Sequence, residues 1–217
     1  MKKILVLAAL AAISLVGNAH ADLVAHWNFN SLSIATASAP GAGGVPTSIA
    51  SDSGSANLSL TGWTGLVDDF GGSLLNAQFG DPAEESLSLI SNAGNGSFIE
   101  LSFSMTGFTD LEVAFATRGT STGYNVGQWS YSTDGVNFTD FGVNTARRDT
   151  TFDVVSVSTS ALDNQATAFL RYTLSGATST TGNNRIDNLT LTAVPEPGSA
   201  VVLLGSVIGF GLLRRRR

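Results

Sequence analysis

Cysteine is absent from this sequence of 217 residues, and histidine and lysine are nearly absent. Without cysteine the chain has no disulfide, no thiol nucleophile and no cysteine-ligated zinc site. The histidines are His20 and His26, and the lysines are Lys2 and Lys3. A catalytic triad in the body of the chain would therefore depend on His26 alone. Because His26 lies beside Trp27 in a predicted strand, we expect it to be an ordinary structural histidine.

Positive charge is also scarce between the two ends of the chain. The whole sequence has eleven Lys and Arg against seventeen Asp and Glu. When the two lysines, Glu196 and the four terminal arginines are left out, residues 22–193 hold five arginines and sixteen acids, a net charge near −11. Such a domain repels nucleic acid and anionic membrane surfaces. Its length is sufficient for one domain with its own core.

Residues 1–21 have the three parts of a secretory signal peptide. The first three residues carry the positive charge, residues 4–16 are almost continuously apolar, and Ala19 and Ala21 form an A-x-A cleavage site. The sequence therefore predicts export and a mature chain that begins at Asp22. The alternative is an uncleaved N-terminal anchor, which the small residues of the cleavage site disfavour.

Residues 194–217 form three consecutive segments. The first is stiff and polar and consists of Val194, Pro195, Glu196 and Pro197. Residues 199–213 carry no charge, and as a helix they would reach roughly 22 Å into a hydrocarbon core about 30 Å thick. The chain ends with Arg214, Arg215, Arg216 and Arg217. Because such arginines snorkel into the headgroups and stay cytoplasmic, the body would lie outside the inner membrane. The alternative is a buried helix with a basic tail.

The succession of Val-Pro-Glu-Pro, a short apolar span and an arginine cluster resembles the PEP-CTERM sorting signal of Gram-negative bacteria. The resemblance covers residues 194–217 and implies that a membrane protease, exosortase, cuts the chain near the Pro-Glu-Pro motif. It also implies transient anchoring in the inner membrane with the body in the periplasm, and a final place at the cell surface or outside the cell. Proteins with this signal are associated with exopolysaccharide, biofilm and floc formation.

Residues 22–193 predict an all-β fold, an antiparallel β-sandwich flanked by the signal peptide and the transmembrane sorting helix. Apolar and polar residues alternate in short segments separated by Gly-rich turns. The predicted strands are 22–30, 57–63, 73–79, 99–105, 111–115, 128–132, 152–157, 169–174 and 186–191, and residues 31–55 are predicted to be a long loop. The clearest apolar face consists of Ile99, Leu101, Phe103, Met105, Leu111, Val113, Phe115, Leu170, Tyr172 and Leu174.

Two local features refine this prediction. Asp134-Gly135 favours a tight hairpin turn, because both residues tolerate a positive φ. Ile186 and Leu189 are out of phase, which predicts a bulge near Asp187. The segments 131–138 and 183–191 resemble the hairpin and final strand of jelly-roll modules in secreted, carbohydrate-associated proteins, which implies a jelly-roll-like sandwich.

Five aromatic residues could stack on sugar rings if they were exposed: Trp27, Trp63, Tyr124, Trp129 and Tyr131. Trp129 and Tyr131 have the same parity, so they are expected on one face of the same strand. The alternative is that these rings fill the core, because large aromatic side chains dominate sandwich interiors.

Asp187 is the candidate metal ligand. In the jelly-roll modules that this chain resembles, an acid near the final strand sometimes joins backbone carbonyls in a structural Ca²⁺ site. A hard cation would suit an acidic exported domain without cysteine. The alternative is that Asp187 and Asn188 form local hydrogen bonds with a bulged backbone.

Three classes of function remain open. The first is an exported, exosortase-processed surface or matrix protein associated with extracellular polysaccharide. The second is a carbohydrate-binding module that uses exposed aromatic residues. The third, a secreted hydrolase, is disfavoured because the acid pairs Asp68-Asp69 and Glu84-Glu85 would point to opposite faces of a strand or into solvent. We therefore expect a protein without enzymatic activity.

Overall fold

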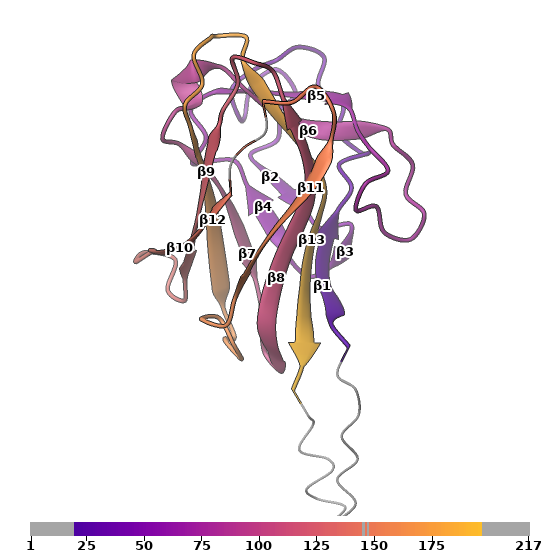
Figure 1. The fold of residues 1–217 in the computed structure, drawn as a ribbon, viewed down its shortest axis with the longest axis vertical. Coiled ribbons are helices and arrows are strands. Elements are labelled where there is room, and N and C mark those ends of the chain that lie inside the picture. Colours follow the sequence, from indigo (N-terminus) through magenta and orange to yellow (C-terminus); the bar gives the residue numbers. More distant parts are fainter. Residues whose placement is uncertain (1–19, 145, 147, 197–217) are drawn as a thin grey trace, which may run out of the picture.

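The computed structural model describes residues 20–144, 146 and 148–196, and it has two sheets packed face to face (Figure 1). Most of the predicted signal peptide, including Ala19, lies outside these residues, as do Pro197 and the four terminal arginines of the predicted sorting signal. In the part of the chain that is described, no helix has the length and apolar character needed to span a bilayer.

Sheet A contains seven strands. They are β1 (Asp22–Trp27), β3 (Ser53–Gly54), β5 (Leu66–Gly71), β6 (Glu85–Ile90), β8 (Phe108–Gly119), β11 (Asp153–Thr159) and β13 (Asn183–Pro195). Their order is β11-β8-β13-β1-β3. The first part of β13 also pairs with β6, which in turn pairs with β5. The long strand β13 is therefore the centre of this sheet.

Sheet B contains six strands. They are β2 (Ser48–Ala50), β4 (Asn57–Ser59), β7 (Phe98–Phe103), β9 (Val126–Ser132), β10 (Thr139–Asn144) and β12 (Ala168–Ser175). Their order is β10-β9-β12-β7-β4-β2, and a 3₁₀ turn, η1 (Asn92–Gly94), precedes β7. Neighbouring strands in both sheets are antiparallel, so the predicted antiparallel β-sandwich is confirmed.

The core lies between the two sheets. All ten residues of the predicted apolar face are buried, none more than 6% exposed. Trp129 of β9 stacks on Tyr172 of β12 with ring centroids 4.6 Å apart, and Phe115 of β8 meets the Tyr172 ring at 5.6 Å. Because each buried large apolar side chain contributes about 1.5–3 kcal/mol, this layer is the main source of stability.

The predicted hairpin is also present. Thr139 at the start of β10 pairs with Tyr131 of β9, and Gly135 in the turn has φ 73°. The Asp134 carboxylate accepts hydrogen bonds from the backbone N–H groups of Val136 and Asn137, both at 2.8 Å. These bonds hold the pKa of Asp134 well below its usual range.

The final strand has the predicted bulge. Its pairing with β8 shifts between Asp187 and Thr190, and Asn188 has φ 48°. The strand continues to Pro195, and Glu196 N–H donates to the carbonyl of Gly107 at 2.8 Å. The sandwich therefore extends beyond the predicted boundary at residue 193. At the other end, β1 begins at Asp22, the predicted first residue of the mature chain.

Three segments differ from the prediction. Residues 73–79 form a loop rather than a strand, because their polar groups bond to the bulged part of β13. Strands β5 and β6 were not predicted, since β6 is buried on both faces and its serines are buried with its leucines. The predicted loop 31–55 contains the short strands β2 and β3.

Candidate functional site at the open edge of the sandwich

The predicted sugar-stacking tryptophans lie in the core. Trp27, Trp63 and Trp129 are 0%, 4% and 1% exposed, and Tyr124 is also fully buried. The indole N–H of Trp27 donates to Ile49 O, and that of Trp63 donates to Leu66 O. The stacking prediction is therefore wrong for these four residues, because a ring inside the sandwich cannot reach a sugar.

Tyr131 lies at the margin of the core. It shares a face with Trp129, as predicted, since Trp129 pairs with Tyr172 and Tyr131 pairs with Leu170 on the next strand. The Tyr131 ring is half-buried and lies 6.0 Å from the ring of Phe141 on β10. Tyr131 thus packs against the Phe141 ring and links it to the core.

The Asp187 carboxylate is held by backbone hydrogen bonds. Its two carboxylate oxygens accept hydrogen bonds from the backbone N–H groups of Ser73, at 2.6 Å, and Asn188, at 2.9 Å. No group of three His, Cys, Asp or Glu side chains suited to a metal occurs among the described residues. Asp187 therefore stabilises the bulge and the loop above it, which is the alternative considered from the sequence.

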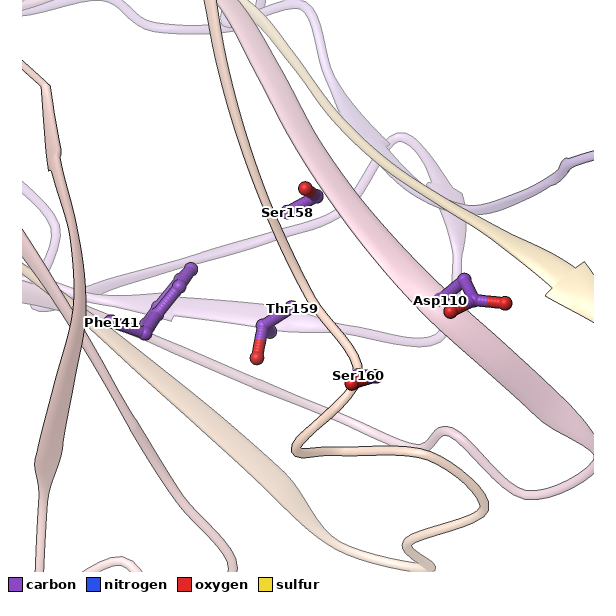
Figure 2. A pocket seen from close by; sticks show the side chains of 5 residues that line it. All are labelled: Asp110, Phe141, Ser158, Thr159 and Ser160. Atoms are coloured by element: carbon purple, nitrogen blue, oxygen red, sulfur yellow. The ribbon is translucent and has the colours of Figure 1, made fainter.

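A pocket of about 470 Å³ lies at the open edge where the two sheets approach each other (Figure 2). Phe141 of β10 comes from the edge of sheet B, and Ser158 and Thr159 come from β11 at the edge of sheet A. Asp110 of β8 and Ser160 complete the lining. The pocket therefore combines one aromatic ring, one carboxylate and three hydroxyl groups.

A second bulge positions Asp110. The pairing of β8 with β13 shifts between Thr192 and Val194, and Asp110 has φ 55°. Its backbone N–H donates to the carboxylate of Asp163 at 2.8 Å. A residue in this left-handed conformation turns the strand and re-aims its side chain. The Asp110 side chain is exposed, like that of Glu112 and unlike those of Leu111 and Val113, and it lines the pocket at the edge of the sandwich.

The composition of the pocket suits a polyhydroxylated ligand. Its volume is within the range of about 300–1,000 Å³ that is typical of ligand sites. The face of an aromatic ring packs against apolar C–H surfaces, and carboxylate and hydroxyl groups exchange hydrogen bonds with ligand hydroxyls. Two of the hydroxyls, those of Ser158 and Ser160, are on exposed residues, so the pocket opens to solvent.

Two other partly exposed aromatic rings, those of Phe98 and Phe138, are covered by the side chain of Arg171. The Arg171 guanidinium lies 4.1 Å from the ring centroid of Phe98 and 3.7 Å from that of Phe138. Arg171 also donates to the Glu100 carboxylate at 2.8 Å. This cluster on the outer face of sheet B is internally satisfied, and we interpret it as structural.

The pocket residues were not predicted from the sequence. Asp110, Phe141 and Ser158 belong to three strands that are separated along the chain, Ser160 follows the last of them, and none stands in a recognisable motif. The one local signal was Asp110 itself, an acid between the turn residues Thr106-Gly107 and the predicted strand 111–115. Such a signal is common in solvated loops and does not indicate a site by itself.

Comparisons with known proteins find similarity in the fold. No family model and no curated protein matches the sequence. The xylan-binding domain CBM22-1 of Paenibacillus barcinonensis Xyn10C is 9% identical, covering 81% of this chain and 96% of that chain, with a TM-score of 0.47. The tandem CBM22-1-CBM22-2 domain of the same protein is 9% identical, covering 84% and 49%, with a TM-score of 0.49.

A third solved structure, the carbohydrate-binding module CBM6cm-2 from Cellvibrio mixtus lichenase 5A in complex with cellotriose, is 7% identical. The match covers 58% of this chain and 85% of that chain, with a TM-score of 0.36. The two-sheet β-sandwich is defined by the strand order of this chain, and the three structures are what it is similar to. At these identities the similarity concerns the fold.

Proposed function

We propose that this chain is an exported β-sandwich that binds neutral extracellular polysaccharide, without catalysis, at the pocket formed by Asp110, Phe141, Ser158, Thr159 and Ser160. The observation that carries the proposal is the combination of an aromatic wall with a carboxylate and three hydroxyls at an open edge. The pocket itself, rather than the likeness to other sandwiches, supports this function.

Electrostatics favours a neutral ligand at this pocket. The body carries a net charge near −11, and Asp110 adds a carboxylate to the lining itself. An acidic sugar in the pocket would be repelled, whereas neutral hydroxyl groups can donate hydrogen bonds to that carboxylate. The class of ligand is therefore a chain of neutral sugars.

The lining favours binding over hydrolysis. Glycosidases use a pair of carboxyl groups on either side of the bond that is cleaved. Asp110 is the single carboxylate among the described residues that line the pocket. Reducing-end release from any polysaccharide that binds would contradict the absence of catalysis and revive the hydrolase alternative.

The binding test uses a panel of neutral polysaccharides, followed by titration calorimetry with those that bind. Phe141→Ala should weaken binding at least tenfold, because the stacking surface is lost, and Asp110→Asn should weaken it less. Phe79→Ala is the matched control, since Phe79 is 78% exposed and lies away from the pocket lining. Addition of Ca²⁺ or EDTA should change nothing. Unchanged binding in Phe141→Ala, or no binding to the panel, would disprove the proposal.

We further propose that the chain is processed as the PEP-CTERM resemblance implies, by a signal peptidase and by exosortase, and that it is displayed as a surface or matrix protein. The geometry is compatible with this. Asp22 pairs with Ala193, so β1 begins and β13 ends at the same end of the sandwich (Figure 1). The Pro-Glu-Pro motif begins at Pro195, the last residue of β13, and Glu196 follows it with a backbone hydrogen bond to Gly107.

Intact-mass analysis of the protein from its native host tests the processing. We expect loss of residues 1–21 and of the segment after the Pro-Glu-Pro motif. A mature protein that retains the four terminal arginines would remove the sorting interpretation. In a host without exosortase, the tail should remain attached and the protein should stay in the membrane fraction.

A further inference from the structure

The four arginines whose placement is described differ in their surroundings. Arg148 donates to the carbonyls of Gly123, at 2.8 Å, and Gly176. Arg171 is paired with Glu100 and lies between two phenylalanine rings. For Arg118 and Arg185, by contrast, no carboxylate among the described residues forms an ion pair with either guanidinium. In a domain with an excess of acids, two unpaired cations are unexpected.

Arg118 and Arg185 lie directly opposite each other. They pair across the antiparallel strands β8 and β13, on the face of sheet A that points away from the core. Like charges at opposed positions destabilise a sheet. Burial and the charge of Arg118 lower the pKa of Arg185, and the Glu85 carboxylate compensates only in part. The described chain thus carries an unneutralised pair of guanidinium groups.

Aromatic rings flank this pair. The Arg118 guanidinium carbon lies 5.7 Å from the ring centroid of Phe152, and that of Arg185 lies 4.8 Å from the ring centroid of Phe70. Arg185 also donates to the carbonyl of Gly71 at 2.9 Å. These contacts restrict the side chains and so preorganise their N–H groups for a ligand.

Unpartnered buried donors lie in the same row of the sheet. Ser88 of β6 pairs with Arg185 of β13, and it is 0% exposed. Among the described residues, neither the Ser88 hydroxyl nor the Nε of Arg185 has a hydrogen-bond partner. Buried polar groups almost always have a partner, so each such group requires an explanation. Asp68, the next residue in the row, accepts from the Asp69 N–H and forms no ion pair with Arg185.

We propose that Arg118, Arg185 and Ser88 form a binding site for a single carboxylate or sulfate group carried by an acidic sugar. Two guanidinium groups offer the N–H donors that planar carboxylates and sulfate oxygens accept, and the anion would remove the repulsion between the arginines. The excess of acids on the rest of the domain repels densely charged polymers. The site therefore selects polysaccharides in which acidic residues are widely spaced.

This site is independent of the pocket at the sandwich edge, and its test uses different probes and variants. The full-length chain, in mild non-ionic detergent, is titrated with methyl glucuronide, glucose 6-sulfate and methyl glucoside. We expect one or both of the charged sugars to bind and to raise the melting temperature, with a loss of affinity as salt is added. Methyl glucoside should produce neither effect at this site. The two charged probes distinguish a uronate from a sulfate ester.

Arg118→Gln and Arg185→Gln should each weaken binding of the charged sugar at least tenfold. Arg171→Gln is the matched control, because it removes a cation from sheet B and should leave this binding unchanged. The Arg118 side chain makes no hydrogen bond to another described residue, and its strand pairing uses the backbone alone. Arg118→Gln should therefore fold and, without ligand, should melt at a higher temperature than the original chain. Failure of both charged sugars to bind, unchanged binding in Arg118→Gln, or an equal loss in Arg171→Gln would overturn the proposal.

Discussion

Phe103 and Ser102 are neighbours on β7 with opposite surroundings. Phe103 points between the sheets and is 6% exposed, whereas Ser102 is on the outer face of sheet B and is partly exposed. Successive side chains of a strand point to opposite faces, so a single backbone step changes the environment from core to surface. The two positions therefore measure how much the core layer contributes.

Phe103→Ala should lower the free energy of unfolding by about 3–5 kcal/mol, because it removes a large buried ring and leaves a cavity. Ser102→Ala should change it by no more than about 0.5 kcal/mol, as is usual at the surface. Urea denaturation of both variants provides the measurement. Equal losses at the two positions would mean that the assignment of faces is wrong.

Asp187 is buried, and its ionisation is linked to folding. Burial raises the pKa of Asp187 to about 7; the Asp81 charge acts in the same direction, and the N–H bonds from Ser73 and Asn188 oppose the shift. Because the folded-state pKa exceeds the unfolded value of 3.8, the protonated form is favoured on folding. This contribution to stability is fully present below the unfolded pKa and is lost as the pH rises through about 7.

The original chain should therefore lose about 1–3 kcal/mol of stability between pH 5 and pH 8 relative to Asp187→Asn. Each pH unit up to the folded pKa of about 7 corresponds to about 1.4 kcal/mol, and the loss is complete above it. Comparison of the two proteins cancels the titration of other groups, including His26. Urea denaturation at both pH values gives the difference. Parallel pH profiles would show that Asp187 is not the titrating group.

At the scale of elements, the bulge of β13 holds the loop of residues 72–84 onto sheet A. The Asn188 side chain donates to the carbonyls of Ser73 and Leu75, at 2.7 and 3.0 Å. The Asn76 side chain donates in return to the carbonyl of Asn188 at 2.7 Å. These bonds allow the loop to present exposed apolar side chains, among them Leu74, without a strand ladder of its own.

Substitution of Asn188 should release this loop. Asn188→Ala removes two hydrogen bonds and places a side chain that disfavours φ 48° at the bulge, so we expect a loss of about 2–4 kcal/mol. Asn188→Gly also removes the bonds but tolerates the backbone, and it should cost less. Limited proteolysis should cut residues 72–84 faster in both variants. Resistance equal to that of the original chain would show that other contacts hold the loop.

At the scale of the whole molecule, the buried residues of the described body form one continuous core between the two sheets. Near the C-terminal end of the described residues, Glu196 N–H donates to the carbonyl of Gly107 at 2.8 Å. The last pairs of β13 are Val194 with Thr109 and Pro195 with Phe108. The body is therefore expected to fold on its own when those pairs are kept.

A fragment of residues 22–196 should be soluble and nearly all-β by circular dichroism. A fragment of residues 22–193 should fold but be less stable by about 1–3 kcal/mol, because it lacks the last two strand pairs and one further hydrogen bond. Denaturation of the two fragments gives the difference. Aggregation of the longer fragment would indicate that the chain ends take part in the fold.

Much of the fold could be predicted from local patterns. The alternation in residues 99–105 and 169–174 placed two central strands, and Asp134-Gly135 placed a hairpin, because each of these signals acts over a few neighbouring residues. Strand β6 was missed because both of its faces are buried, so its serines did not mark a solvated face. The loop of residues 73–79 was predicted as a strand because its hydrogen-bond partners lie on β13, more than a hundred residues away.

The sequence by itself determined the class of the body, its acidic charge, the exclusion of cysteine chemistry and the position of the bulge at Asp187, because composition and periodicity are local properties. Only the tertiary structure decided which rings are buried and which polar groups meet. Trp129 lies in the core, Phe141 and Asp110 line the same pocket at an edge, and Arg118 pairs with Arg185 across two strands. These outcomes depend on strand order and register, which bring residues far apart in the chain to within reach of one another.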